Sequence, residues 1–247
     1  MKTASYGRIL FGVSAVLFGV IALMWHDPET WQTMRRIWSL PFGTSVGEAL
    51  MVAQIAGGIG TFFRQTVRPA AILLVVVYSL FALACVPSIV AAPAAFGSYD
   101  SFFEQFCLLC GAIAVYAATD RNEEWSATLG GAVRIGLGLC AISFTLAQVF
   151  YLRDTASLVP AWIPPNQMFW AILTTIAFGL AAIAMLVNRR ARLAINLMAL
   201  MIALFGLLVW IPLLVAHPAS HFSWSEFALT CLIAGASRSI AELQPAR

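Results

Sequence analysis

The sequence predicts an all-α, polytopic membrane protein, and three observations lead to this fold class. The first is composition: 61% of the 247 residues are hydrophobic, 10% are charged and the mean hydropathy is +0.88, whereas soluble domains are about half apolar and about a quarter charged. The second is a series of long apolar runs, and the third is the placement of basic residues between them. The basic residues are all arginines except Lys2, and they form no basic run. Nucleic acid is therefore excluded as a partner.

Each predicted span is an apolar run near the length of about 20 residues that a helix needs to cross about 30 Å of hydrocarbon. The first run follows a basic tip but is long for a signal peptide, and no clear Ala-x-Ala cleavage site precedes His26, so we assign it to a membrane helix. The eight predicted spans are 8–25, 46–63, 69–91, 101–118, 132–151, 167–187, 191–215 and 224–240.

Two longer segments, 26–45 and 152–166, separate spans on the same side of the membrane. The first carries Trp31, Trp38 and Phe42 with polar residues between them, which predicts a short helix lying on the outer interface. The second is rich in proline and therefore cannot be a regular helix throughout. Neither segment suggests a separate soluble domain.

The basic residues set the predicted orientation. Eight spans place both termini on one side, which we assign to the cytoplasm because basic residues concentrate in cytoplasmic loops. Three basic residues then lie outside, Arg35, Arg36 and Arg153, and eleven lie inside: Lys2, Arg8, Arg64, Arg68, Arg121, Arg134, Arg189, Arg190, Arg192, Arg238 and Arg247. Every tryptophan except Trp125 falls at or beyond the outer end of a span, as in an interfacial belt.

An internal repeat divides the chain into two predicted four-helix units, 1–122 and 123–247. The stretch "VPSIVAAPA" (86–94) aligns with "IPLLVAHPA" (211–219) at an offset of 125. Other matches have nearly the same offset: Cys107 with Cys231 at 124, Arg8 with Arg134 at 126, and Arg68 with Arg192 at 124. Because each unit has an even number of spans, the units are expected to be parallel and related by a pseudo-twofold axis along the membrane normal.

The first unit contains the stretches "GRILFGVSAVLFGVIAL" and "LPFGTSVGEALMVAQIAGGIGTFFRQTVRPAAILLVVVYSLFAL". With these stretches it resembles the DoxX family of bacterial membrane proteins. In that family an acid starts the second span, a Gly-Gly pair lies within it and an arginine precedes the third, features that match Glu48, Gly57, Gly58 and Arg68. The second unit is also similar, but Asn166 or Gln167 stands in place of Glu48 and the Gly-Gly pair is missing.

The resemblance covers nearly the whole chain as a tandem pair and implies a location in the bacterial cytoplasmic membrane. It also implies work beside a thiol, sulfur or quinone redox system, with a periplasmic or membrane redox protein as partner and a quinone as cofactor. Glu48 and Arg68 become candidate binding residues on this basis. The sequence carries no metal or nucleotide signature, and it does not specify an oligomeric state.

The sharpest local motif is Cys107-Leu-Leu-Cys110 in the fourth span. A Cys-x-x-Cys pair can cycle between dithiol and disulfide, which makes both residues candidate catalytic groups for electron relay to a quinone. Packing is the competing interpretation, because buried cysteine is a common small apolar side chain. Cys85 and Cys140 are assigned to packing.

Acids and histidines near the outer ends of spans have structural interpretations. Ser101-Phe-Phe-Glu104 and Ser223-Trp-Ser-Glu226 match the Ser-x-x-Glu capping box and are expected to open spans 4 and 8. Glu48 starts span 2, where it either faces the bundle or only interacts with the helix dipole. Pro218 lies between His217 and His221 and favours a turn over a metal site.

No ionisable side chain is expected near the middle of a span, which weighs against proton relays and ion-coupled transport. Gln54 and Gln148 are the candidate midplane binding groups, or they hydrogen-bond between helices. Glycines in spans 1, 2 and 5, such as Gly57 and Gly58, predict close helix approach.

Three functions therefore remain open. The first is a membrane subunit or partner of a thiol, sulfur or quinone redox system, as an accessory subunit if it takes part in an enzyme. The second is a non-catalytic scaffold. The third is a carrier for a small or lipophilic molecule at the interface of the two units. A cavity lined by Gln54 and Gln148 would favour the carrier, and a solid bundle would exclude it.

Overall fold

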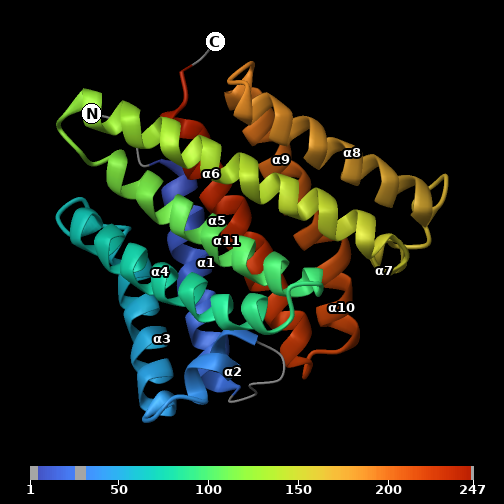
Figure 1. Ribbon diagram of the computed structural model, residues 1–247, viewed down its shortest axis with the longest axis horizontal. Helices are drawn as coiled ribbons and strands as arrows, with labels where there is room; N and C mark the ends of the chain where they lie inside the picture. The colour runs from blue at the N-terminus through green and yellow to red at the C-terminus, as the bar shows by residue number, and fades with distance from the viewer. Residues whose placement is uncertain (1–4, 26–31, 246–247) are drawn as a thin grey trace.

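The computed structural model describes residues 5–25 and 32–245, and all regular secondary structure in this part of the chain is helical (Figure 1). The helices are α1 (Tyr6–Met24), α2 (Gln32–Trp38), α3 (Gly43–Gly60), α4 (Val67–Ala91), α5 (Phe96–Ala117), α6 (Glu123–Phe150), α7 (Leu152–Leu158), α8 (Gln167–Leu186), α9 (Ala191–Phe205), η1 (Gly206–Trp210), α10 (Ile211–Ala216) and α11 (His221–Leu243).

The chain is a multi-pass membrane protein. Six of its described helices, α1, α4, α5, α6, α8 and the continuous segment Ala191–Ala216, are long and apolar enough to cross a membrane. Their outward faces are apolar: Leu193, Leu197 and Leu200, for example, form an exposed row along α9. Such a surface would be unfavourable in water and suits the hydrocarbon of a bilayer.

Each of the eight predicted spans coincides with a helix, although α3 and α11 are not among the six apolar enough to qualify as membrane spans. Helix α11 packs against α1, α5 and α9, and Figure 1 shows it running through the middle of the bundle. Its polar side chains therefore face protein rather than lipid, which explains its lower hydropathy. The eight-span topology and the orientation of the termini stay predictions.

The predicted capping boxes are wrong. Helix α5 begins at Phe96, so Ser101 lies inside it and Glu104 is its ninth residue. Helix α11 begins one turn earlier than expected, where Ser220 is the N-cap and its side chain accepts a hydrogen bond from the backbone N–H of Ser223. A Ser-x-x-Glu pattern opens a helix only if no better start precedes it. Both glutamates therefore lie within their helices and not at the N-caps.

The two outer segments contain the short helices α2 and α7. Helix α2 begins at Gln32, and residues 26–31, which include His26 and Trp31, lie outside the described residues. Helix α7 ends at Leu158, and residues 159–166, which contain the prolines, are not helical. The prediction that this segment is not a regular helix throughout is confirmed.

The order of helix contacts is the same in both halves of the chain. Helix α1 packs against α3, α3 against α4 and α4 against α5; in the second half α6 packs against α8, α8 against α9 and α9 against α11. Across the halves, α1 packs on α11 as α6 packs on α5. This pattern is what two parallel units related by a twofold axis would produce, but it does not by itself test the repeat.

Small residues bring α1 close to its neighbours, as the glycines in the first two spans predict. A Cβ added to Gly58 of α3 would lie 2.8 Å from the carbonyl oxygen of Gly12 in α1. A Cβ on Gly235 of α11 would lie 2.6 Å from the backbone nitrogen of Phe11. The backbones therefore approach as closely as membrane helices do at small residues.

The start of α1 and the end of α11 meet at one end of the bundle. The Ser5 hydroxyl and the Gly7 backbone N–H both donate to the carboxylate of Glu242, which also pairs with Arg238 at 3.5 Å. Nearby, the Gln244 side chain donates to the carbonyl of Gly130 in α6. This polar end is the one predicted to face the cytoplasm.

Candidate functional site

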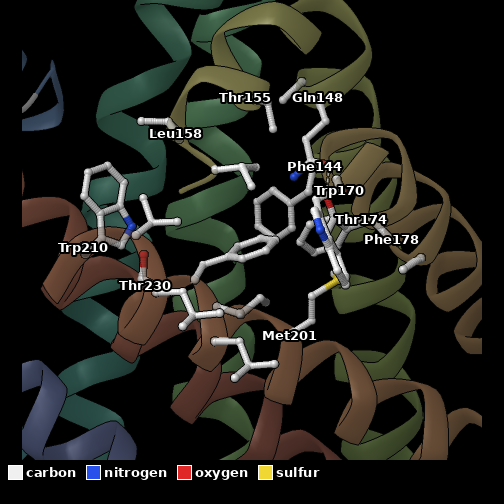
Figure 2. Close-up of a pocket in the computed structure, with 18 of the residues that line it drawn as sticks. Phe144, Gln148, Thr155, Leu158, Trp170, Thr174, Phe178, Met201, Trp210 and Thr230 are labelled. Atoms are coloured by element: carbon white, nitrogen blue, oxygen red, sulfur yellow. Dashed lines mark hydrogen bonds between the residues drawn. The ribbon is translucent and has the colours of Figure 1, made fainter. Parts of the chain in front are cut away.

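A pocket of about 630 Å³ opens in the second half of the bundle, toward the end of the molecule opposite this polar network. Helices α6, α8, α9 and α11 and the η1 turn form its walls, with α7 at one edge and two side chains of α5 at another. Figure 2 shows Trp210 on one side of the opening and Phe144, Trp170 and Phe178 on the other.

Two residues of the pocket wall align with buried aromatic residues in the first half of the chain. At the repeat offset of 124, Tyr78 aligns with Ile202 and Phe81 with Phe205. Tyr78 and Phe81 are completely buried, whereas Ile202 and Phe205 line the pocket. Isoleucine is smaller than tyrosine and therefore leaves more space at this position of the pocket wall.

A single π-helical turn, η1, shapes the wall that carries Trp210. Pro212 follows this turn at the start of α10. Proline has no N–H to donate, and its ring clashes with the carbonyl four residues earlier in a regular α-helix. The wider turn relieves this clash, and π-turns within α-helices are often found at functional sites. Helix α4, by contrast, continues through Pro87 without a π-turn.

The lining is mainly aromatic and aliphatic, with a few polar groups. The indole N–H of Trp170 donates to the carbonyl of Pro164 at 2.9 Å, which fixes the ring. Gln148 Oε1 accepts from the hydroxyls of Thr174 at 3.3 Å and Thr175 at 2.9 Å. These bonds hold the amide of Gln148 in the wall, since Gln148 and Thr174 both line the pocket (Figure 2).

Among the lining residues that the structure describes, four carry carboxyl groups and none is Lys, Arg or His: Asp100, Glu104, Asp154 and Glu226. Asp100 and Glu104 lie one turn apart on α5, and Glu226 comes from α11, which packs against α5. Glu104 interacts electrostatically with both Asp100 and Glu226. One carboxylate oxygen of Asp100, Oδ1, is buried without a hydrogen-bond partner in the described structure.

The pocket reaches the exposed apolar surface of the bundle. Leu158 of α7, Leu173 of α8 and Leu204 of α9 line it and are each more than 40% exposed. An apolar rim at this position would allow a lipophilic molecule to enter from the bilayer. The site therefore combines a concave apolar interior with a few convergent polar groups, as small-molecule sites usually do.

Of the two predicted midplane glutamines, the structure brings only Gln148 to the pocket. Gln54 is completely buried between α3 and α1, where its Nε2 donates to the carbonyl of Ala15 at 3.0 Å. Its role is helix packing. The pocket is therefore not the cavity between both glutamines that would have favoured a carrier, because only Gln148 lines it.

The two binding residues suggested by the DoxX resemblance lie away from the pocket. Glu48 is exposed on α3, so the alternative that it faces the bundle is wrong. Arg68 Nη2 lies 3.1 Å from Asp120 Oδ2 and 3.1 Å from the hydroxyl of Tyr116, and its guanidinium lies 5.2 Å from the centroid of the Tyr116 ring. Arg68 thus ties the ends of α4 and α5 together.

Cys107 and Cys110 are buried as free thiols, and a third thiol joins them. Cys140 of α6 is completely buried and interacts electrostatically with both Cys107 and Cys110. On the same face of α6, a Cβ added to Gly136 would lie 2.6 Å from Cys110 Sγ. This cluster could not be predicted from the sequence, because the third cysteine comes from the other predicted unit.

The two histidines near α10 and α11 form no metal site. His217 ends α10, and His221 stacks on Trp25 with 5.5 Å between ring centroids and an interplanar angle of 3°. Within residues 5–25 and 32–245, no group of three His, Cys, Asp or Glu side chains is arranged to hold a metal ion.

Comparison with known proteins adds no identification: no family model, no curated protein and no solved structure matches the chain. The resemblance to the DoxX family therefore stays a prediction. The fold and the site define the class as a multi-pass helical membrane protein with a pocket open to the lipid.

Proposed function

We propose that this protein binds a small lipophilic molecule in the pocket between α6, α8, α9 and α11. The observation that carries the proposal is a 630 Å³ cavity with aromatic walls and an apolar rim in the lipid-facing surface. Binding sites for small molecules in helical bundles are typically cavities of this size between helices. This function corresponds to the carrier hypothesis, with the site moved from the unit interface into the second unit.

Filling the pocket from within tests the proposal. Ala177 lines the pocket, and its neighbour Ile176 is 54% exposed on the outer face of α8. Ala177→Phe places a ring inside the cavity, whereas Ile176→Phe places the same ring in the lipid and serves as the matched control. The readout is saturable binding of diphenylhexatriene, a neutral lipophilic fluorophore, to protein in nanodiscs, after subtraction of binding to empty nanodiscs.

We expect the wild type and Ile176→Phe to bind alike and Ala177→Phe to lose about tenfold or more in affinity, which corresponds to about 1.4 kcal/mol. Equal saturable binding by all three proteins would contradict the pocket as the site. The absence of saturable binding to the wild type would contradict the proposed function itself.

The proposed setting is the bacterial cytoplasmic membrane, with eight spans in two parallel units and both termini inside. The matching order of helix contacts in the two halves supports the repeat, and the excess of basic residues on one side supports the orientation. Cysteine labelling from either side of the membrane at Glu123 and Ser157 would test this topology. We expect Glu123→Cys to react from the cytoplasm and Ser157→Cys from the periplasm.

The three buried thiols favour a second candidate function, in thiol redox chemistry with a quinone. Cys140 offers Cys107 a partner from a neighbouring helix, whereas two cysteines one turn apart on one helix do not form a disulfide easily. Oxidation would join the two sulfurs, and the two thiol hydrogens with their electrons would reduce a quinone to the quinol.

Serine variants test the redox candidate. Cys107→Ser and Cys140→Ser should each abolish oxidation of the protein by a soluble ubiquinone analogue, measured by counting free thiols after denaturation. Cys231→Ser is the matched control, because this cysteine is only partly buried and lies on α11. A count of free thiols that does not fall on treatment of the wild type would rule out the redox function.

A further inference from the structure

The charge of the pocket narrows the ligand class. The described lining residues include four acids and no Lys, Arg or His, although the protein as a whole carries a net charge of +3. When ionised, these groups repel a ligand with a negative charge and attract one with a positive charge. The pocket wall is thus electrostatically complementary to a cation.

Three of these carboxyl groups, those of Asp100, Glu104 and Glu226, are short of polar partners in the described part of the chain. Among the described residues, neither Glu104 nor Glu226 forms a hydrogen bond or an ion pair with another side chain, and Asp100 keeps one buried oxygen unsatisfied. A desolvated carboxyl group is costly unless it takes up a proton or meets a cation. Three such groups side by side, with a cavity beside them, indicate that the missing partner is a ligand.

The ligand is organic rather than a metal ion. The described residues include no three-ligand arrangement suitable for a metal, and the cavity is far larger than a single ion requires. Its aromatic wall also fits an organic cation, because Trp and Phe faces attract ammonium groups. Trp170 and Trp210 stand on opposite sides of the opening (Figure 2).

We propose that the pocket binds a lipophilic organic cation, with its charge against Glu104, Glu226 and Asp100 and its apolar body against the aromatic wall. This inference rests on the proposed function, since it names the ligand class of the same pocket. The bilayer-facing rim supplies the route of entry, and the carboxyl groups select the charge.

Three related aromatic phosphorus and boron compounds that differ in charge test the inference. Tetraphenylphosphonium and tetraphenylborate have nearly the same shape and opposite charges, and triphenylphosphine oxide is a smaller neutral relative. Binding of each to the full-length protein in nanodiscs is measured by equilibrium dialysis, with empty nanodiscs as the blank. The variants are the double substitution Glu104→Gln with Glu226→Gln, and Glu123→Gln as a control at the opposite end of α6.

We expect the wild type and Glu123→Gln to bind the phosphonium about tenfold or more tightly than the neutral analogue, and the borate not at all. The double variant should lose this preference while it still binds the neutral analogue, which shows that its pocket is intact. Equal affinities for cation and neutral analogue would overturn the cation inference and leave the pocket proposal standing. Failure of all three ligands would overturn the cation inference, and the Ala177→Phe experiment would then decide separately whether the pocket binds lipophilic molecules.

Discussion

The contact between α1 and α11 makes a quantitative prediction about Gly235. The Cβ of an alanine there would lie 2.6 Å from the backbone nitrogen and 2.8 Å from the Cα of Phe11, about 1 Å short of ordinary contact. Because both atoms belong to the backbone, a whole helix must move to relieve the clash. Overpacking of this kind costs about 1–3 kcal/mol.

Gly131→Ala is the matched control for this substitution. Gly131 lies within α6, and a Cβ added to it would meet nothing within 4 Å. Both substitutions gain the same helix propensity, roughly 1 kcal/mol, so the difference between the two variants isolates the clash. We expect Gly235→Ala to be less stable than Gly131→Ala by about 1–3 kcal/mol, which is about 2–4 °C in Tm for each kcal/mol.

The assay is thermal unfolding of both variants in the same mild detergent, followed by circular dichroism and by the loss of the monodisperse peak in size-exclusion chromatography. Equal Tm values for the two variants would refute the close approach of α1 and α11. A Gly235→Ala protein more stable than the control would refute it more strongly.

Three other predictions concern groups outside the pocket. The backbone N–H of Asn122 and the guanidinium of Arg68 hold the pKa of Asp120 below its usual value. The ionised carboxylate therefore stabilises the fold at neutral pH, and this contribution is lost as the pH falls through the folded-state pKa. Asp120→Asn should lower Tm at pH 7 but not in strong acid, and a Tm difference from the wild type that is the same at both pH values would contradict this. Gln54→Leu removes one hydrogen bond but also a buried carbonyl oxygen that has no partner in the described structure. The free energy of unfolding, measured by denaturation in detergent, should therefore change by less than about 1 kcal/mol. A larger loss of stability would show that the hydrogen bond is essential. Cys231 is partly exposed and Cys107 is completely buried. N-ethylmaleimide should therefore modify Cys231 before Cys107 in the native protein. If mass spectrometry shows the reverse order of modification, the packing of these two cysteines is contradicted.

The helical segments could be predicted from the sequence because a membrane helix leaves a long local signature. Each predicted span coincides with a helix, since a run of about 20 apolar residues has few alternatives in a bilayer. Helix ends were less well predicted. Helix α6 begins at Glu123, capped by Asn122, nine residues before the predicted start at 132, because apolar composition does not mark where a helix continues into water.

The pocket could not be predicted in the same way, because it depends on which side chains from distant segments meet. Glu104 and Glu226 fitted a capping pattern, and only the earlier helix starts place them in the pocket wall. The interaction of Cys140 with Cys107 could not be predicted from the sequence, because it crosses the boundary between the predicted units. The alignment of Tyr78 with Ile202 puts the smaller side chain in the second half of the chain, but this exchange alone does not mark a pocket.

Photolabelling from within the bilayer tests the central claim most directly. A diazirine-bearing lipophilic amine is activated on the protein in nanodiscs, with and without an excess of tetraphenylphosphonium, and the modified residues are mapped by mass spectrometry. The account predicts labelling of Thr174, Met201 and Trp210, which line the pocket, and its suppression by the competitor. Labelling confined to lipid-facing residues such as Leu197 and Leu200, unchanged by the competitor, would contradict the account.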